Sequence, residues 1–431
     1  MRSARFYIGF VLLLVIYIYS IVFKIIPIST KIILEFVGFV YCLKYFGRDY
    51  RIKKEYLTII RIIIFIVVWD TITCVLNGSV AFHLTKVALP LLGSIFASHA
   101  LYNYSRNHID NTDTILYLVV ITIFLESVLT IFMKLFPPLY EVMSTLLVFE
   151  LGDKEGIQDI YELARFYGIG NAIYFGVLPS CTLGVITSVY IIKTTDSSKR
   201  RILAAFMFVL IAIVSFFVAR TAIVIVAGAA LLLLIYALHD GLGKAVKISL
   251  LFTVVVLVAY YVVSSYTSEN EDLEKWAFGF LMDKNVESGS AGNVIGWWEN
   301  TTFDLKTLLI GDAQYVDETG RYYKHVDIGF FREIFYGGLI GLFLNLYLHY
   351  RVLRSIYRRR RNFDTKFMVL AFFACYMVIL AKGDSNMVSF FILYLAFYTG
   401  GVFEKIEQRT VAIPNNNIQS DIKIGRCMCV R

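Results

Sequence analysis

The feature that most constrains this chain is the recurrence of long apolar runs along nearly its whole length. A helix of about 20 apolar residues crosses the hydrocarbon core of a bilayer. With 58% hydrophobic and 17% charged residues, the 431-residue chain also has too little polar surface to cover a soluble globule. We therefore expect an all-α polytopic membrane protein with about 12 transmembrane helices. The expected spans are 6–26, 32–46, 57–76, 84–102, 115–136, 168–192, 201–219, 221–238, 246–265, 328–350, 366–382 and 386–403.

The net charge of +8 follows this topology. Basic residues gather in loops that alternate along the chain, most markedly in the run Arg358–Arg361. An excess of Lys and Arg marks the cytoplasmic loops of membrane proteins, so the charge does not indicate a nucleic-acid partner. Counting through the spans places both termini in the cytoplasm. The transmembrane domain is expected over 1–403, followed by a polar cytoplasmic tail over 404–431.

One polar segment interrupts the apolar pattern between the ninth and tenth spans. It runs from 266 to 327, has twelve acidic residues against five basic ones, and is expected to form a large extracytoplasmic (periplasmic) loop within the membrane domain. Apolar residues at helical spacing predict short amphipathic helices in it, one of them within 293–310. The pair Trp297 and Trp298 offers aromatic faces for sugar rings, although Trp also anchors proteins at membrane interfaces.

Three arginines stand out on the acidic, extracytoplasmic face because each lies at the boundary of a span. These are Arg165, Arg220 and Arg321, and Lys324 adds a further cation. A guanidinium at headgroup depth can bind a phosphate through two parallel hydrogen bonds. The alternative is that each arginine binds a lipid headgroup or a nearby carboxylate. Arg220 lies in a tight turn between two apolar helices, where an unpaired charge is costly, so it should have an anionic partner.

His325 and Asp327 lie just before the tenth span, and either side chain can act as a general base toward a hydroxyl group. A structural role for a single His near a membrane is the alternative. Arg332 and Glu333 are expected to support this site or to pair with one another. Lys382 and Asp384 are expected to contribute to the same site, and Asp70 and Glu126 to serve in proton handling or packing. No Cys/His spacing predicts a metal, and no cofactor is expected.

Several of these motifs together resemble the Wzy-type polymerases of O-antigen and capsule, and the related O-antigen ligases, of bacterial envelopes. The resemblance covers mainly 161–345. It is carried by Arg165–Gly168, by Ala219–Thr221, by Asp327–Gly329 after the long loop, and by Gly337–Gly341 beyond it. The chain departs from the family pattern at Ser288–Asn293, which has no arginine.

The resemblance implies an inverting, metal-independent glycosyltransferase of the bacterial inner membrane. Its substrate would be an undecaprenyl-pyrophosphate-linked oligosaccharide in the lipid bilayer, and its partners a chain-length regulator and a flippase. Arg165, Arg220 and Arg321 would hold the leaving pyrophosphate, and His325 or Asp327 would take the proton of the acceptor hydroxyl. Two alternatives stay open: a ligase that transfers polymer to a lipid A core, and a 12-span flippase or transporter.

Overall fold

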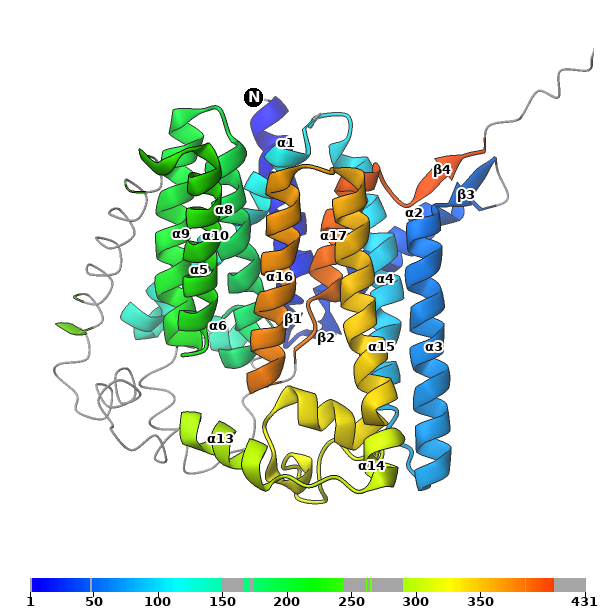
Figure 1. The fold of residues 1–431 in the computed structure, drawn as a ribbon. Coiled ribbons are helices and arrows are strands. Elements are labelled where there is room, and N and C mark those ends of the chain that lie inside the picture. Colours follow the sequence, from blue (N-terminus) through cyan, green and yellow to red (C-terminus); the bar gives the residue numbers. More distant parts are fainter. Residues whose placement is uncertain are drawn as a thin grey trace, which may run out of the picture.

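The computed structural model describes a helical bundle (Figure 1). The described residues are 2–46, 49–109, 111–148, 166, 168–170, 174–243, 246, 261, 264–265, 290–383 and 385–406. Within them the chain forms 14 α-helices, two 3-10 helices and two antiparallel sheets of two strands each. The described part of the chain is thus mostly helical, as predicted.

Six of these helices are long and apolar enough to cross a membrane. At 1.5 Å per residue their 19 to 24 residues extend over about 29–36 Å. Side-chain oxygens of Asn111, Ser197 and Asn362 cap the N-termini of three of them. The six are α3 (Lys54–Asn77), α4 (His83–Ser105), α5 (Thr112–Leu135), α9 (Ser198–Val218), α10 (Ala222–Asp240) and α16 (Phe363–Lys382).

The other predicted spans differ from this pattern, so the twelve-span topology stays a prediction. Four of them coincide with helices of 12 to 18 residues: α1 (Arg2–Tyr19), α2 (Thr30–Leu43), α8 (Leu178–Thr194) and α17 (Val388–Thr399). The tenth corresponds to α15 (Gly329–Arg359), which has 31 residues and is kinked. The ninth, 246–265, lies almost wholly outside the described residues.

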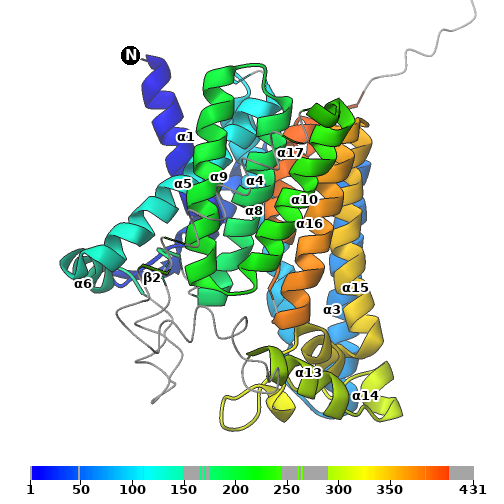
Figure 2. The same cartoon turned by 60° about the vertical axis from the view of Figure 1, so that its left-hand side comes forward.

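The helices pack in two groups joined through α16 and α17 (Figures 1 and 2). One group contains α5, α8, α9 and α10, and the other contains α2, α3, α4 and α15. α8 contacts α16, and α15 contacts both α16 and α17. The core that joins the groups consists of large apolar side chains, among them Tyr190, Phe372 and Phe391.

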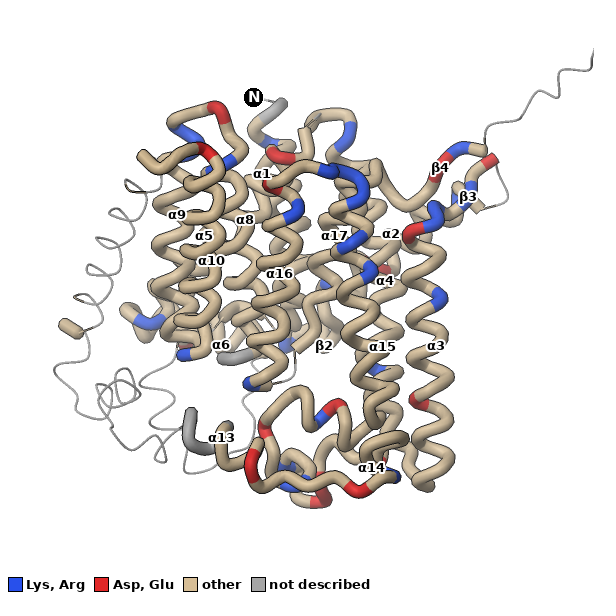
Figure 3. The backbone as a smooth tube through the Cα atoms, viewed as in Figure 1, with Lys and Arg blue, Asp and Glu red and all other residues tan. Residues whose placement is uncertain are grey.

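The two ends of the bundle differ in charge (Figure 3). The end that carries Arg358–Arg361, here called the basic end, also holds the N-terminus and the sheet of β3 (Tyr50–Ile52) and β4 (Phe403–Lys405). The opposite end, here called the loop end, carries α13 (Ser290–Asn300) and α14 (Leu305–Leu309). It also holds α6 (Pro137–Leu146) and the hairpin of β1 (Val22–Phe23) and β2 (Ile26–Ser29).

α15 is broken near the loop end, at Gly338, where φ is 66° and ψ is −172°. This backbone conformation is essentially restricted to glycine. A Cβ atom at Gly338 would lie 2.5 Å from the carbonyl carbon of Leu309, so the close approach of α14 also requires glycine. The break leaves three carbonyl groups in the preceding turn without their helical partners, and at membrane depth such groups need other donors.

Donors from outside the helix satisfy these three carbonyl groups. Two of the donors are backbone N–H groups of successive residues that follow α14, and the third donor is a side chain of α3. The break therefore connects α15 with α3 and with the chain after α14. The bonds are Asp312 N–H to Phe335 O at 2.6 Å, Ala313 N–H to Tyr336 O at 3.1 Å, and Trp69 Nε1–H to Gly337 O at 2.7 Å.

α17 has only 12 residues, which corresponds to a length of about 18 Å. Residues 385–387, which precede Val388, run into the bundle from the loop end without helical structure (Figure 1). Side chains accept hydrogen bonds from the N–H groups of Met387, which precedes α17, and Val388, its first residue. Asn386 Oδ1 accepts from Val388 N–H at 2.8 Å, and His349 Nε2 accepts from Met387 N–H at 3.4 Å.

Candidate functional site

The described part of the polar segment before α15, residues 290–327, folds over the loop end of the bundle. Residues 266–289 lie outside the described residues. The predicted amphipathic stretch of this segment forms two helices, α13 and α14, separated by a short extended stretch. Trp297 packs against a small apolar cluster beneath α13, and Trp298 lies 4.5 Å from the ring of Phe331 while half exposed. The cluster consists of Val326, Ile328, Phe331 and Phe335, with Phe303, Tyr323 and Phe330 against it.

A tight hairpin leads from this helical layer to the start of α15. A bridge pairs Val316 with Tyr322, and Asp317 at its turn accepts hydrogen bonds from Thr319 and from the backbone N–H of Arg321. The hydrogen bond from the Thr319 hydroxyl is the largest cause that lowers the pKa of Asp317. Arg321 is exposed on this hairpin. The hairpin itself places two tyrosines, Tyr315 and Tyr322, against α15.

Arg332 is the centre of the site. It is 6% exposed, and its guanidinium carbon lies 3.7 Å from the ring centre of Tyr322 and 4.3 Å from that of Tyr315. Its Nη2 donates to the hydroxyl of Tyr315, and its Nη1 lies 3.4 Å from Asp327 Oδ1. A cation held against aromatic faces is fixed in orientation. Arg332 therefore presents its remaining N–H groups in a defined direction.

Asp327 also faces a second cation, from α16. Lys382 Nζ lies 4.0 Å from Asp327 Oδ2 and 5.5 Å from the ring centre of Trp297. Lys382, which the sequence analysis grouped with this site, therefore lies beside Asp327. Asp384 lies outside the described residues. Two cations, one carboxylate and an aromatic face thus meet where α15 and α16 reach the loop end.

A polar and aromatic brace connects Arg332 to the interior of the bundle. Asp70 is fully buried and accepts from Tyr336 O–H at 2.7 Å and from the N-terminal N–H of Thr85 in α4 at 2.7 Å. A carboxylate at a helix N-terminus is favourable, which gives Asp70 a packing role. The Tyr336 hydroxyl in turn accepts from His83 N–H, and the His83 ring stacks on Tyr315 at 3.6 Å.

Lys324 and His325 have positive φ angles of 54° and 57°. Residues other than glycine rarely adopt positive φ angles, and such backbone strain concentrates at functional sites. Lys324 Nζ lies 3.9 Å from Asp312 and 4.6 Å from the ring centre of Phe335. His325 is exposed. His325 and Asp327 are thus both near the start of α15, but only Asp327 is in contact with Arg332 and Lys382.

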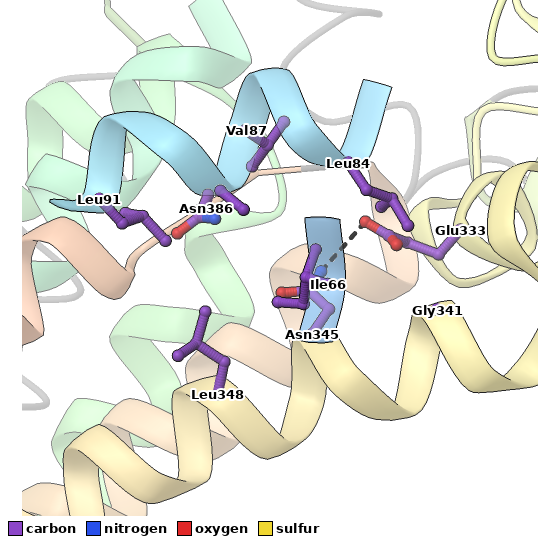
Figure 4. Close-up of a pocket in the computed structure, with 10 residues that line it drawn as sticks. Ile66, Leu84, Val87, Leu91, Glu333, Gly341, Asn345, Leu348 and Asn386 are labelled. Atoms are coloured by element: carbon purple, nitrogen blue, oxygen red, sulfur yellow. Dashed lines mark hydrogen bonds between the residues drawn. The ribbon is translucent and has the colours of Figure 1, made fainter. Parts of the chain in front are cut away.

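Glu333 lines a small cavity between the helices (Figure 4). Its Oε1 accepts from Asn345 Nδ2 at 3.0 Å. The cavity encloses about 20 Å³, which is room for one water molecule and far too small for a sugar. Its lining residues are Ile66, Leu84, Val87, Ala88, Leu91, Glu333, Gly341, Asn345, Leu348 and Asn386.

Arg220 lies at the same end of the bundle but in the other helix group, in the turn between α9 and α10. The chain that follows Arg165 reaches this turn: Phe166 N–H donates to Phe217 O at 3.3 Å, and the two rings stack at 4.7 Å. Arg165 itself lies outside the described residues. In the same group Glu126 is buried and accepts from Thr130 Oγ1 at 3.0 Å.

The sequence analysis did not identify a polar stripe on α3 that holds the chain after α14, at Ile310 and Gly311, in place. Trp69, Thr73 and Asn77 are spaced four residues apart and so lie on one face of the helix. Thr73 Oγ1 donates to Ile310 O at 3.3 Å, and Asn77 Nδ2 donates to Gly311 O at 3.1 Å. The signal that could have found them is this spacing within an otherwise apolar span.

A comparison with family models, with curated proteins and with solved structures finds no match to this chain. The chemical character of the site is therefore argued from its residues. Among the residues that the structure describes, no group of three or more His, Cys, Asp or Glu side chains could hold a metal ion. The cluster of Asp327, Arg332 and Lys382 can bind an anion, accept a proton and place a ring against Trp297.

Proposed function

We propose that this chain polymerises polyprenyl-pyrophosphate-linked oligosaccharides, of the undecaprenyl class, at the outer leaflet of a bacterial inner membrane. The observation that carries the proposal is the cluster of Asp327, Arg332 and Lys382 beside Trp297 at the loop end. A lipid-linked sugar presents a pyrophosphate and a sugar ring at this depth, and the cluster offers cations for the first and an aromatic face for the second.

The orientation in this proposal follows from the charge of the two ends. Short basic loops remain in the cytoplasm, so the basic end with Arg358–Arg361 is placed inside and the loop end outside. The N-terminus and β4 are then cytoplasmic. A repeat unit delivered by a flippase reaches the loop end from the outer leaflet, and a chain-length regulator is the further partner of such a reaction.

The proposed reaction is an inverting glycosyl transfer. A hydroxyl oxygen of the incoming unit bonds to the anomeric carbon of the growing chain, and the bond from that carbon to the lipid pyrophosphate breaks. The electron pair of that bond leaves with the pyrophosphate, whose charge must be stabilised by cations when no metal does so. The hydroxyl proton passes to a base, for which Asp327 and His325 are the candidates. In this proposal Arg165, Arg220 and Arg321 also stabilise the charge of the leaving pyrophosphate.

The test is the polysaccharide made by cells that lack the protein and are complemented with variants. We expect Asp327→Asn and Arg220→Ala to leave single repeat units at normal protein level. Arg201→Ala, a loss of the same charge at the basic end, should leave long chains unchanged, because the Arg201 side chain is exposed and donates to the backbone carbonyl of Thr195.

Two other outcomes would contradict the proposal. Complete loss of transfer, with no single unit attached to the acceptor, would identify a ligase. Movement of labelled repeat unit across proteoliposomes without polymer formation would identify a transporter.

A further inference from the structure

Within the described part of the chain, Asp327 forms ion pairs with Arg332 and Lys382, and both are long. Charge-assisted hydrogen bonds between nitrogen and oxygen measure about 2.7–2.9 Å. Asp327 Oδ1 lies 3.4 Å from Arg332 Nη1, and Oδ2 lies 4.0 Å from Lys382 Nζ. The carboxylate therefore lies between two cations from different helices without a close bond to either. A larger anion with more oxygens could contact both.

The geometry around Arg332 favours such an anion. Its side chain is buried and its guanidinium is fixed against Tyr315 and Tyr322, so little freedom is lost on binding. Its Nε makes no hydrogen bond with the residues that the structure describes, although the atom is buried. A guanidinium has five N–H donors, which suits it to phosphate oxygens.

Position and neighbours indicate which phosphate compound fits. Lys382 is the last residue of α16, a helix long enough to span a membrane. If α16 spans the bilayer, we expect the Lys382 ammonium at the level of the lipid headgroups. Trp297 lies beside it and can contact the sugar attached to a phosphate. A lipid-linked sugar pyrophosphate places its charged group and its first sugar at these two positions.

We propose that Arg332 and Lys382 form the subsite for the pyrophosphate of the lipid-linked sugar, and that Asp327 lies between the two cations until the phosphate displaces it. This inference rests on the proposed function, and it assigns phosphate binding to two residues other than Arg165, Arg220 and Arg321. It has an unusual consequence. Removing the charge of Asp327 should strengthen binding of the phosphate, because a carboxylate repels it, while loss of either cation should weaken binding.

The experiment uses the full chain in nanodiscs of neutral lipid and measures equilibrium binding of radiolabelled polyprenyl pyrophosphate. We expect Lys382→Gln and Arg332→Lys to weaken binding by about tenfold or more, and Asp327→Asn to strengthen it by about tenfold. The matched control is Lys306→Gln, because Lys306 also pairs with an aspartate, Asp312, at 3.6 Å but is exposed outside the cluster. General damage to the fold would lower binding in every variant and could not produce the opposite sign for Asp327→Asn.

Polyprenyl alcohol, inorganic pyrophosphate and phosphatidylglycerol serve as competitors. Competition by inorganic pyrophosphate as strong as that by the lipid would assign the subsite to a free phosphate and overturn the lipid assignment. Equal competition by phosphatidylglycerol would assign it to bulk headgroups and do the same. If the wild-type protein polymerises the substrate but Lys382→Gln and Arg332→Lys bind polyprenyl pyrophosphate as the wild type does, the proposed subsite is wrong and the proposed function stands. Absence of polyprenyl pyrophosphate binding by the wild-type chain would overturn the proposed function as well.

Discussion

Gly338→Ala tests whether the break in α15 holds the loop-end segment in place. If the backbone kept its present conformation, an alanine with φ near 66° and ψ near −172° would cost about 1–3 kcal/mol in strain alone. Contact of the new Cβ with the carbonyl group of Leu309 would add to that cost. The variant therefore cannot retain the break without a measurable loss of stability.

The alternative for this variant is a straight helix through residue 338. Three carbonyl groups would then regain helical bonds worth about 1 kcal/mol each. The N–H groups of Asp312 and Ala313 and the indole of Trp69 would lose their acceptors, at about 1–3 kcal/mol for each buried group. The variant will adopt whichever conformation, the strained break or the straight helix, costs less free energy. We therefore expect the free energy of unfolding to fall by about 2 kcal/mol or more.

Thermal unfolding of the purified variants and amide exchange at 310–313 measure this effect. The control is Gly341→Ala, three residues further along α15, where the new Cβ would make an ordinary 3.4 Å contact with Leu84. Alanine in a helix interior is favoured over glycine by up to about 1 kcal/mol, so this variant should be as stable as the wild type or more stable. Equal melting of Gly338→Ala and wild type, with full protection of the 312 and 313 amides, would refute the reasoning.

Two further predictions concern groups outside the membrane-spanning helices. The hydrogen bond from the backbone N–H of Thr307, followed by that from its hydroxyl, lowers the pKa of Asp304. The ionised carboxylate therefore stabilises the fold at pH values above the unfolded-state pKa of Asp304. This stabilisation is lost as the pH falls through the lower pKa of the folded state. Exchange protection of α14 should therefore fall in acid for wild type but stay flatter in Asp304→Asn; a pH-independent wild type would contradict this. Lys53→Met removes an ammonium that donates to the carbonyls of Thr399, Gly400 and Gly401 and should cost about 1.5–3 kcal/mol in thermal unfolding. The control is Lys54→Met, which changes the adjacent, exposed lysine. Equal melting temperatures of the two variants would argue against a stabilising contribution of the Lys53 ammonium.

The helices were predictable where apolar pattern and length agree. α3, α5 and α16 begin and end within a few residues of the expected spans, because hydropathy reports directly on burial in an apolar environment. The expected span 386–403 is longer than α17. Its first residues are held by Asn386 and His349 in place of helical bonds, and hydropathy does not detect such side-chain partners.

The candidate site was predictable in part. The sequence indicated the start of α15, and Lys382 lies beside Asp327 as expected. Pairing between Arg332 and Glu333 was a poor expectation, because adjacent residues on a helix do not face each other. Arg332 contacts the hairpin, whereas Glu333 contacts Asn345 within the bundle. The brace from Asp70 to Tyr336 joins residues 266 positions apart, which no local pattern encodes.

The break in α15 also restricts how this chain can vary in length. Asp312 and Ala313 bond in register with two successive carbonyl groups, and Gly311 fits against Tyr336 with room for no side chain. A residue inserted between Leu309 and Ala313 would shift this register and leave buried polar groups without partners. The turn at 317–320, which is held mainly by its own Asp317, has no such constraint. Insertions and deletions in related chains should therefore gather at that turn, while the stretch before it keeps a constant length.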